Sequence, residues 1–244
     1  MSGHSKWSQI KRQKGAADQK RGQLFGKLTN AIIVAARQGG GDPETNLTLK
    51  IATEKARLAN MPKENIDRAI SRGTGILGGA QIEEGLYEAF GPQGIGILIE
   101  VATDNKNRTN SEIKNVLNKF GAKLTGSGAI SYQFERMGKL LISVSESNRE
   151  EIELVIIESG AEDFEEQKDA ITVYTKASEL MKIKKIIDNQ NIRDQEASLT
   201  WEPKTIINIE NSSQAQKIIG LMEAIDNLDD VAAVYSNFDT PKEA

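Results

Sequence analysis

The stretch GPQGIGILIEV (residues 91–101) decides the fold, because the hydrophobic period of the chain changes around it. Residues 91–94 are typical of a turn, and residues 95–101 form an apolar, β-branched run that is typical of a strand. We therefore expect a hairpin that begins near Tyr87. Before this stretch the apolar residues recur with a helical period, and after it strands and helices alternate.

Three helices are expected ahead of the hairpin. Apolar residues recur at helical spacing in residues 24–35, and glycines 39–41 end that run. An N-cap followed by a first-turn proline at residues 42–43 opens a second helix. Residues 60–62 contain a similar N-cap candidate and proline, which predict a third helix that ends at Gly73.

The remaining chain predicts an α+β fold. Strands are expected at 95–101, 130–134, 140–144, 170–175, 198–201, 206–209 and 231–235, with helices at 113–120, 150–159, 177–189 and 213–228. Strands placed before and after helices are typical of split βαβ, ferredoxin-like α/β sandwiches. The expected domains are a basic three-helix domain (1–76), an α+β domain (80–136 plus 205–240) and a second α+β domain inserted into it (137–204).

The net charge of −4 conceals a strong separation of charge along the chain. Residues 1–72 carry 14 Lys or Arg and 6 Asp or Glu, a net of +8, so the rest of the chain has a net charge of −12. A sustained cationic helical segment favours a polyanionic partner, and nucleic acid is the partner we expect. A solvated amphipathic helix whose lysines aid solubility is the alternative.

The candidate nucleic-acid-binding residues follow from this charge. The N-terminal set consists of Lys6, Lys11, Arg12, Lys14, Lys20, Arg21 and Lys27 for phosphates, with Trp7 for stacking on a base. Lys106 and Arg108, beside the N-terminus of the helix after Asp104, are a second candidate phosphate contact. A plain capping loop is the alternative there. Lys63, Arg68 and Arg72 on the third helix could extend the same face, although Glu64 and Asp67 lie among them.

Composition excludes several kinds of chemistry. The chain has no Cys and a single His, which excludes disulfides, thiolate zinc sites and pairs of imidazoles. No apolar run is long enough to cross a bilayer, and we expect a soluble, cytoplasmic protein. We expect no cofactor, metal, membrane or small-molecule substrate. An enzyme with a carboxylate site and a protein-interaction adaptor are the competing function classes.

Three further motifs favour structural interpretations. Residues 73–78 match GxGxxG, but a helix precedes them where a dinucleotide site needs a strand, so we expect a linker. The acidic residues 162–169 favour a solvated edge, with a contact surface for a protein partner as the alternative. Tyr132 and Phe134 could stack on bases from one strand, but core packing is favoured.

Several segments, taken in order, resemble the YebC/PmpR family. They are Gly3-His4-Ser5-Lys6-Trp7, Lys20-Arg21-Gly22, residues 39–43, Asn60-Met61-Pro62, residues 68–73, Tyr87-Glu88, Gly91-Pro92, residues 104–109 and residues 234–238. Gln13 departs from the family pattern, which has a basic residue there, and this weakens the assignment of individual phosphate contacts.

The resemblance implies a three-domain cytoplasmic protein, with a helical domain and two α/β domains, one interrupted by the other. The family is described as probable DNA-binding transcriptional regulators. Mitochondrial relatives are translational activators for cytochrome c oxidase, and bacterial members are linked to relieving ribosomes stalled on proline-rich sequences. A DNA-binding regulator of transcription is therefore the leading expectation, and a translation factor bound to ribosomal RNA is the alternative.

Overall fold

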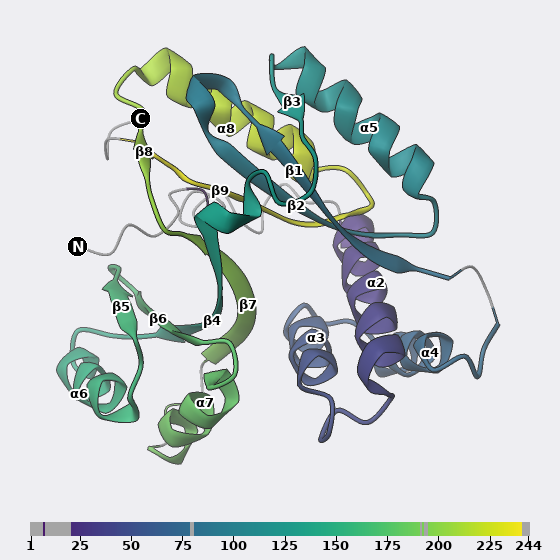
Figure 1. Ribbon diagram of the computed structural model, residues 1–244. Coiled ribbons are helices and arrows are strands. Elements are labelled where there is room, and N and C mark those ends of the chain that lie inside the picture. Colours follow the sequence, from purple (N-terminus) through teal and green to yellow (C-terminus); the bar gives the residue numbers. More distant parts are fainter. Residues whose placement is uncertain (1–6, 8–20, 79–80, 191, 193–194, 241–244) are drawn as a thin grey trace. The chain divides into compact units, whose positions relative to one another are not determined.

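The computed structural model describes residues 7, 21–78, 81–190, 192 and 195–240, which fall into two compact units. The smaller unit is the stretch Arg136–Glu202, and the larger unit combines the described residues before and after it (Figure 1). The predicted α+β class with N-terminal helices is confirmed. The division into three domains stays a prediction, because the helices and the first sheet share one compact unit.

Three helices form the N-terminal part of the larger unit: α2 (Arg21–Gly39), α3 (Leu47–Leu58) and α4 (Lys63–Gly73). Both α3 and α4 pack on α2 (Figure 1). Their common core contains Ile32 of α2, Leu49 of α3 and Ile66 of α4. Ile82 and Ala102, which lie outside these helices, belong to the same core and join the helices to the neighbouring sheet.

The second helix begins later than predicted, because Asn46 and not Asp42 is its N-cap. The Asn46 side chain accepts a hydrogen bond from the Leu49 backbone N–H (3.1 Å). Its amide also donates to the carbonyl oxygens of Ala35 (2.7 Å) and Gly40 (2.8 Å). One side chain therefore caps α3 and ties it to the end of α2.

The sheet of the larger unit has the strand order β3-β1-β2-β9. Its strands are β1 (Glu83–Phe90), β2 (Gly96–Thr103), β3 (Lys123–Leu124) and β9 (Val231–Ser236). The predicted hairpin is confirmed, since β1 and β2 pair antiparallel with Phe90 opposite Gly96. A parallel pair, β8 (Ile207–Asn208) and β10 (Phe238–Asp239), forms a separate small sheet.

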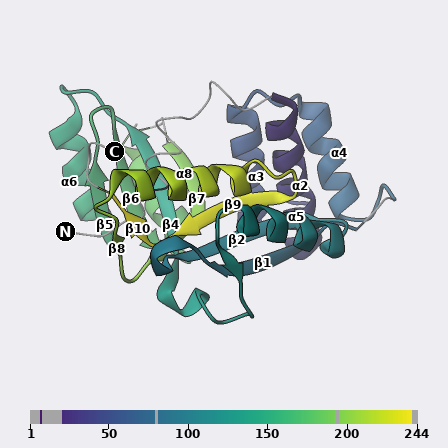
Figure 2. The same ribbon diagram turned by 90° about the horizontal axis from the view of Figure 1, so that it is seen from above.

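Two helices, α5 (Lys106–Lys119) and α8 (Ser212–Asp226), pack on each other and cover one face of this sheet (Figure 2). Ile97 and Ile99 of β2 share a buried cluster with Ile113 of α5 and Ile218 of α8. Ala102, on the opposite face of β2, belongs to the helical core instead. Burial on both faces explains why β2 is a continuous apolar run in the sequence.

The smaller unit has the sheet order β5-β6-β4-β7. Its elements are β4 (Phe134–Ser143), α6 (Arg149–Ser159), β5 (Asp163–Glu166), β6 (Ala170–Lys176), α7 (Leu180–Asn189) and β7 (Gln195–Pro203). Both helices connect strands that are not neighbours, which is the split βαβ arrangement predicted for this segment. Ile142, Ile156, Ile171 and Ile183 are among its buried residues.

Residues 130–134 do not form the predicted strand. Ser131–Gln133 is a short 3-10 helix, and β4 begins after it at Phe134. Phe134 is 3% exposed, whereas Tyr132 is 66% exposed. The favoured core interpretation is therefore right for Phe134 and wrong for Tyr132, because the turn breaks the alternation that would place both rings on one face.

Candidate nucleic-acid interface

The helical part of the larger unit carries an excess of positive charge in its described residues. Residues 21–78 contain nine Lys or Arg and five Asp or Glu, a net of +4. Arg57, Lys63 and Arg68 have exposed side chains on α3 and α4. Lys6, Lys11, Arg12, Lys14 and Lys20, the N-terminal phosphate candidates, lie outside the described residues, and Arg21 is the first residue of α2.

Lys27 lies where α2 meets the end of α8. Its ammonium donates to the carbonyl oxygen of Asp226, the last residue of α8. Nearby, the Gln23 side chain donates to Asp229 (3.3 Å). A cation at the C-terminus of a helix is favoured by the helix dipole and by the carbonyls that end there. This geometry gives Lys27 a structural role, and its predicted phosphate contact stays a prediction.

Trp7 lies in the core and not on the surface as expected. It is 3% exposed and shares the buried cluster of Ile95, Ile97 and Phe238. Its indole N–H has no hydrogen-bond partner within the part of the chain that the structure describes. In this arrangement the ring presents no face to a base, so Trp7 stabilises the larger unit.

The loop before α5 holds the second candidate contact. Asn105 caps α5 by accepting a hydrogen bond from the Arg108 backbone N–H (3.1 Å). The Lys106 ammonium lies 2.6 Å from the Glu83 carboxylate. The hydrogen bond and the charge of Lys106 lower the pKa of Glu83, and Glu83 in turn raises the pKa of Lys106.

Arg108 forms an ion pair with Asp230, a buried carboxylate at the start of β9. The Arg108 guanidinium lies 2.8 Å from Asp230, and the hydroxyls of Thr109 (2.6 Å) and Thr103 (3.0 Å) donate to the same carboxylate. Burial acts to raise the pKa of Asp230, but the bonds from Thr109, Arg108 and Thr103 outweigh it and hold the pKa below its usual value. Lys106 and Arg108 are thus both engaged in ion pairs inside the larger unit.

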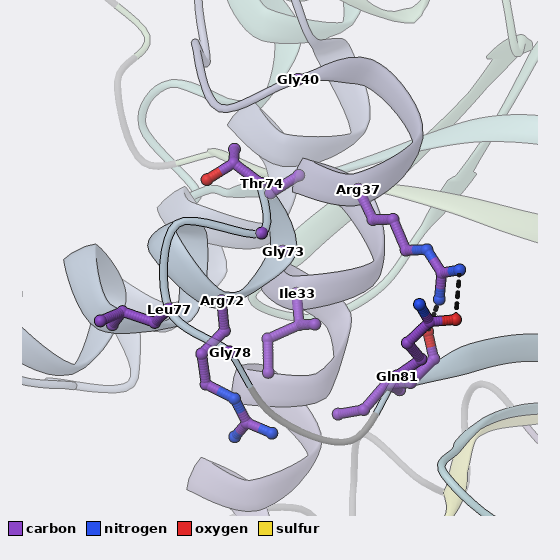
Figure 3. Close-up of a pocket in the computed structure, with 12 residues that line it drawn as sticks. Ile33, Arg37, Gly40, Arg72, Gly73, Thr74, Leu77, Gly78 and Gln81 are labelled. Atoms are coloured by element: carbon purple, nitrogen blue, oxygen red, sulfur yellow. Dashed lines mark hydrogen bonds between the residues drawn. The ribbon is translucent and has the colours of Figure 1, made fainter.

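A cavity of about 580 Å³ lies between the ends of α2 and α4 and the glycine-rich loop that follows (Figure 3). Arg37 and Arg72 line it, and no carboxylate is among the described residues of its lining. Arg37 donates to two neutral acceptors, the Gln81 side chain (3.0 Å) and the Ile82 carbonyl (3.3 Å). The described lining therefore carries two positive charges and no carboxylate, although the charge of Arg37 also helps to lower the pKa of Glu83 outside the lining.

Close packing of α4 on α2 creates this cavity. A side chain at Gly73 would place its Cβ 2.4 Å from the Ile33 carbonyl oxygen, so glycine is required where α4 ends against α2. Arg72, the residue before Gly73, and Arg37 of α2 both line the cavity (Figure 3). The sequence predicts a linker at residues 73–78 and does not indicate the cavity, because two arginines 35 positions apart carry no local signal.

Comparison with known proteins identifies the family. Residues 5–76 match the family model described as the TACO1/YebC protein N-terminal domain, and residues 82–238 match the TACO1/YebC second and third domain. The chain belongs to the TACO1/YebC family. The resemblance drawn from the sequence motifs is thereby confirmed.

Other members of the TACO1/YebC family are similar over their whole length. A "Probable transcriptional regulatory protein" from Halothermothrix orenii is 45% identical over 245 residues, which cover 100% of this chain and 97% of the relative. A protein of the same name from Rubrobacter xylanophilus is 46% identical, with 100% and 97% covered. The crystal structure of a conserved hypothetical protein from Aquifex aeolicus matches with a TM-score of 0.86 and 43% identity over 93% of both chains.

Elsewhere in this TACO1/YebC chain, residues 162–169 are predicted to be a solvated acidic edge, and the structure places them around an edge strand, β5. β5 contains Asp163, Glu165 and Glu166 and pairs with β6 alone in its sheet. The protein partner suggested for this surface stays a prediction. Among the described residues, no group of acidic or histidine side chains could hold a metal ion, and no helix is long and apolar enough to cross a membrane.

Proposed function

We propose that this chain is a non-enzymatic regulator of transcription that binds DNA in the cytoplasm through its basic N-terminal part. The observation that carries the proposal is the separation of charge, +8 over residues 1–72 against −12 over the rest. The names of the relatives, probable transcriptional regulatory proteins, support the same function and support a non-enzyme. The acidic remainder of the chain would supply fewer phosphate contacts than the basic part.

The proposed phosphate contacts come from two groups of cations. The first is the N-terminal set Lys6, Lys11, Arg12, Lys14, Lys20, Arg21 and Lys27. The second is Arg37 and Arg72, whose cavity has the charge and the hydrogen-bond donors that a phosphate needs. Lys106 and Arg108 stay a predicted second contact, but a phosphate there would have to displace a carboxylate, so we expect them to contribute little to the affinity.

Salt dependence of binding to duplex DNA tests the electrostatic mechanism. If about five cations contact phosphates, the logarithm of the affinity should fall against the logarithm of salt concentration with a slope of roughly −4 to −5. An affinity that does not change with salt would remove the basis of the proposal.

Charge reversal locates the contact surface. Changing Lys11, Arg12 and Lys14 to Glu should weaken binding to all duplex sequences, because phosphate contacts are independent of sequence. The matched control changes the exposed Lys168, Lys182 and Lys185 of the smaller unit to Glu, which alters the total charge equally. Equal losses in the two variants would show that total charge, and not the N-terminal part, controls binding.

Crosslinking in cells, followed by sequencing of bound DNA and bound RNA, identifies the target. Recovery of promoter DNA is the expected result. Recovery of ribosomal RNA without DNA would replace the transcriptional proposal with the translational one, in which the protein acts on stalled ribosomes.

A further inference from the structure

Tyr132 is a large aromatic side chain displayed on the surface of the larger unit. It is 66% exposed at the centre of the 3-10 turn Ser131–Gln133. Within residues 91–153, all of them described, it is the single exposed large apolar side chain. Its sequence neighbours Ser131 and Gln133 are polar.

A buried carboxylate fixes the backbone that carries Tyr132. Glu88 of β1 is 3% exposed and accepts hydrogen bonds from the backbone N–H groups of Gly128 (2.8 Å), Ile130 (2.6 Å) and Ser131 (2.9 Å). Burial acts to raise the pKa of Glu88, but these backbone bonds outweigh it and lower the pKa. The carboxylate stays charged near neutral pH and holds the segment leading into Tyr132.

Gln133 fixes the other side of the turn. Its carbonyl accepts from the Lys204 backbone N–H (2.8 Å), and its side-chain oxygen accepts from the Asn237 amide (3.2 Å). Its own amide donates to the Tyr132 hydroxyl (3.2 Å). A Cβ on Gly96 would approach Ile130 to 2.9 Å, so the turn also packs tightly on the start of β2.

We propose that Tyr132 is a stacking platform for an unpaired base of a single-stranded nucleic acid. The inference rests on the proposed nucleic-acid-binding function and deepens it. Because the hydrogen bonds hold the backbone that carries this exposed ring, little backbone entropy is lost when a base stacks on it, and any base can stack. Lys204 has an exposed side chain, and its backbone N–H donates to the carbonyl of Gln133, the residue after Tyr132, so we expect Lys204 to hold an adjoining phosphate. Bases inside a duplex are already stacked and are not available to Tyr132.

The test compares a fluorescent twelve-nucleotide thymidine strand with a duplex of the same length, using the full chain. Tyr132→Ala should weaken binding of the single strand roughly 5- to 150-fold and leave the duplex unchanged. Tyr132→Trp, which keeps an aromatic face, should retain the affinity. Lys204→Gln should lower the salt slope for the single strand by about 0.7. Unfolding of each variant in urea is measured in parallel, and since Tyr132 is exposed no change is expected.

A photochemical readout locates the contact directly. A strand carrying 5-iodouracil should crosslink, on irradiation, to the peptide that contains Tyr132. Crosslinks that map only elsewhere would overturn the inference, as would unchanged single-strand affinity in Tyr132→Ala. An equal loss in Tyr132→Ala and Tyr132→Trp would also overturn it, because stacking would then not be the cause.

Failure of the inference and failure of the proposed function give different results. If the protein binds neither strand nor duplex at low salt, the proposed function is wrong and the inference falls with it. If it binds the duplex with the expected salt slope while single-strand binding is independent of Tyr132, the stacking platform alone is wrong.

Discussion

The loop before α5 and the cavity between α2 and α4 present arginines in opposite electrostatic surroundings. In the loop, Arg108 lies 2.8 Å from the buried Asp230 carboxylate and 3.0 Å from Asp104. In the cavity, Arg37 donates to neutral oxygens. Arg37 and Arg72 both line this cavity, and none of its described lining residues is a carboxylate. The charge of Arg108 is already balanced by two carboxylates of the larger unit, so an anion there would have to break an ion pair. The arginines of the cavity can bind an anion without breaking one.

The two sites therefore differ in what their arginines do: Arg108 stabilises the fold, whereas Arg72 is available to bind an anion. Arg108, Thr109 and Thr103 converge on Asp230, which joins the start of α5 to β9. An anion at Arg108 must compete with the Asp230 carboxylate, which already accepts hydrogen bonds from all three of these side chains. An anion at Arg72 competes with water. We therefore expect the loop to control stability and the cavity to control binding.

Removing the Asp230 carboxylate should have the largest effect. Asp230→Ala removes the carboxylate on which two buried threonine hydroxyls and Arg108 converge and leaves Arg108 with Asp104 alone, which should lower the free energy of unfolding by about 3 kcal/mol. Urea unfolding followed by Trp7 fluorescence in a Trp201→Phe background reports on the larger unit. The matched control is Asp229→Ala, an exposed neighbour of the same charge, with an expected change below about 0.5 kcal/mol. Equal effects would mean that the Asp230 network is not special.

Replacing one arginine in the cavity and one in the loop before α5 tests whether the first controls binding and the second controls stability. Arg72→Gln should weaken binding to duplex DNA about eightfold at 0.1 M salt, the effect of one lost phosphate contact, and leave stability unchanged. Arg108→Gln should leave the affinity within about twofold and lower the stability, because Asp230 loses its ion-pair partner. Fluorescence anisotropy and urea unfolding on the same samples give both numbers.

Two results would contradict that expectation. The control Arg57→Gln removes the same charge from an exposed position of α3 outside the cavity lining. If Arg57→Gln weakens binding as much as Arg72→Gln, the cavity has no special role. If Arg108→Gln weakens binding eightfold while remaining folded, the loop is a phosphate contact despite its ion pairs.

The sequence predicts the elements well because their signals are local. Helical period identified α2, and the turn before an apolar run identified the β1–β2 hairpin. The partners of individual side chains were not predictable in this way. Arg108 and Asp230 are 122 positions apart, and nothing near either residue indicates that they meet. Tyr132 and Phe134 share the spacing of one strand face, yet a 3-10 turn held by Glu88 separates them.

Lowering the pH should have the smallest effect on stability of the changes considered, and it tests whether the charge of Asp230 stabilises the loop. The folded-state pKa of Asp230 is lowered, so its contribution to stability is present above the unfolded-state pKa of about 3.9 and is lost as the pH falls through the folded value. The difference in unfolding free energy between the wild type and Asp230→Asn should therefore be constant from about pH 7 to pH 5 and shrink below about pH 4. Arg72→Gln should show no such change, because no carboxylate among the described residues lines its cavity. A difference for Asp230→Asn that persists unchanged at pH 3 would mean that hydrogen-bond geometry, and not the charge of Asp230, makes the loop stable.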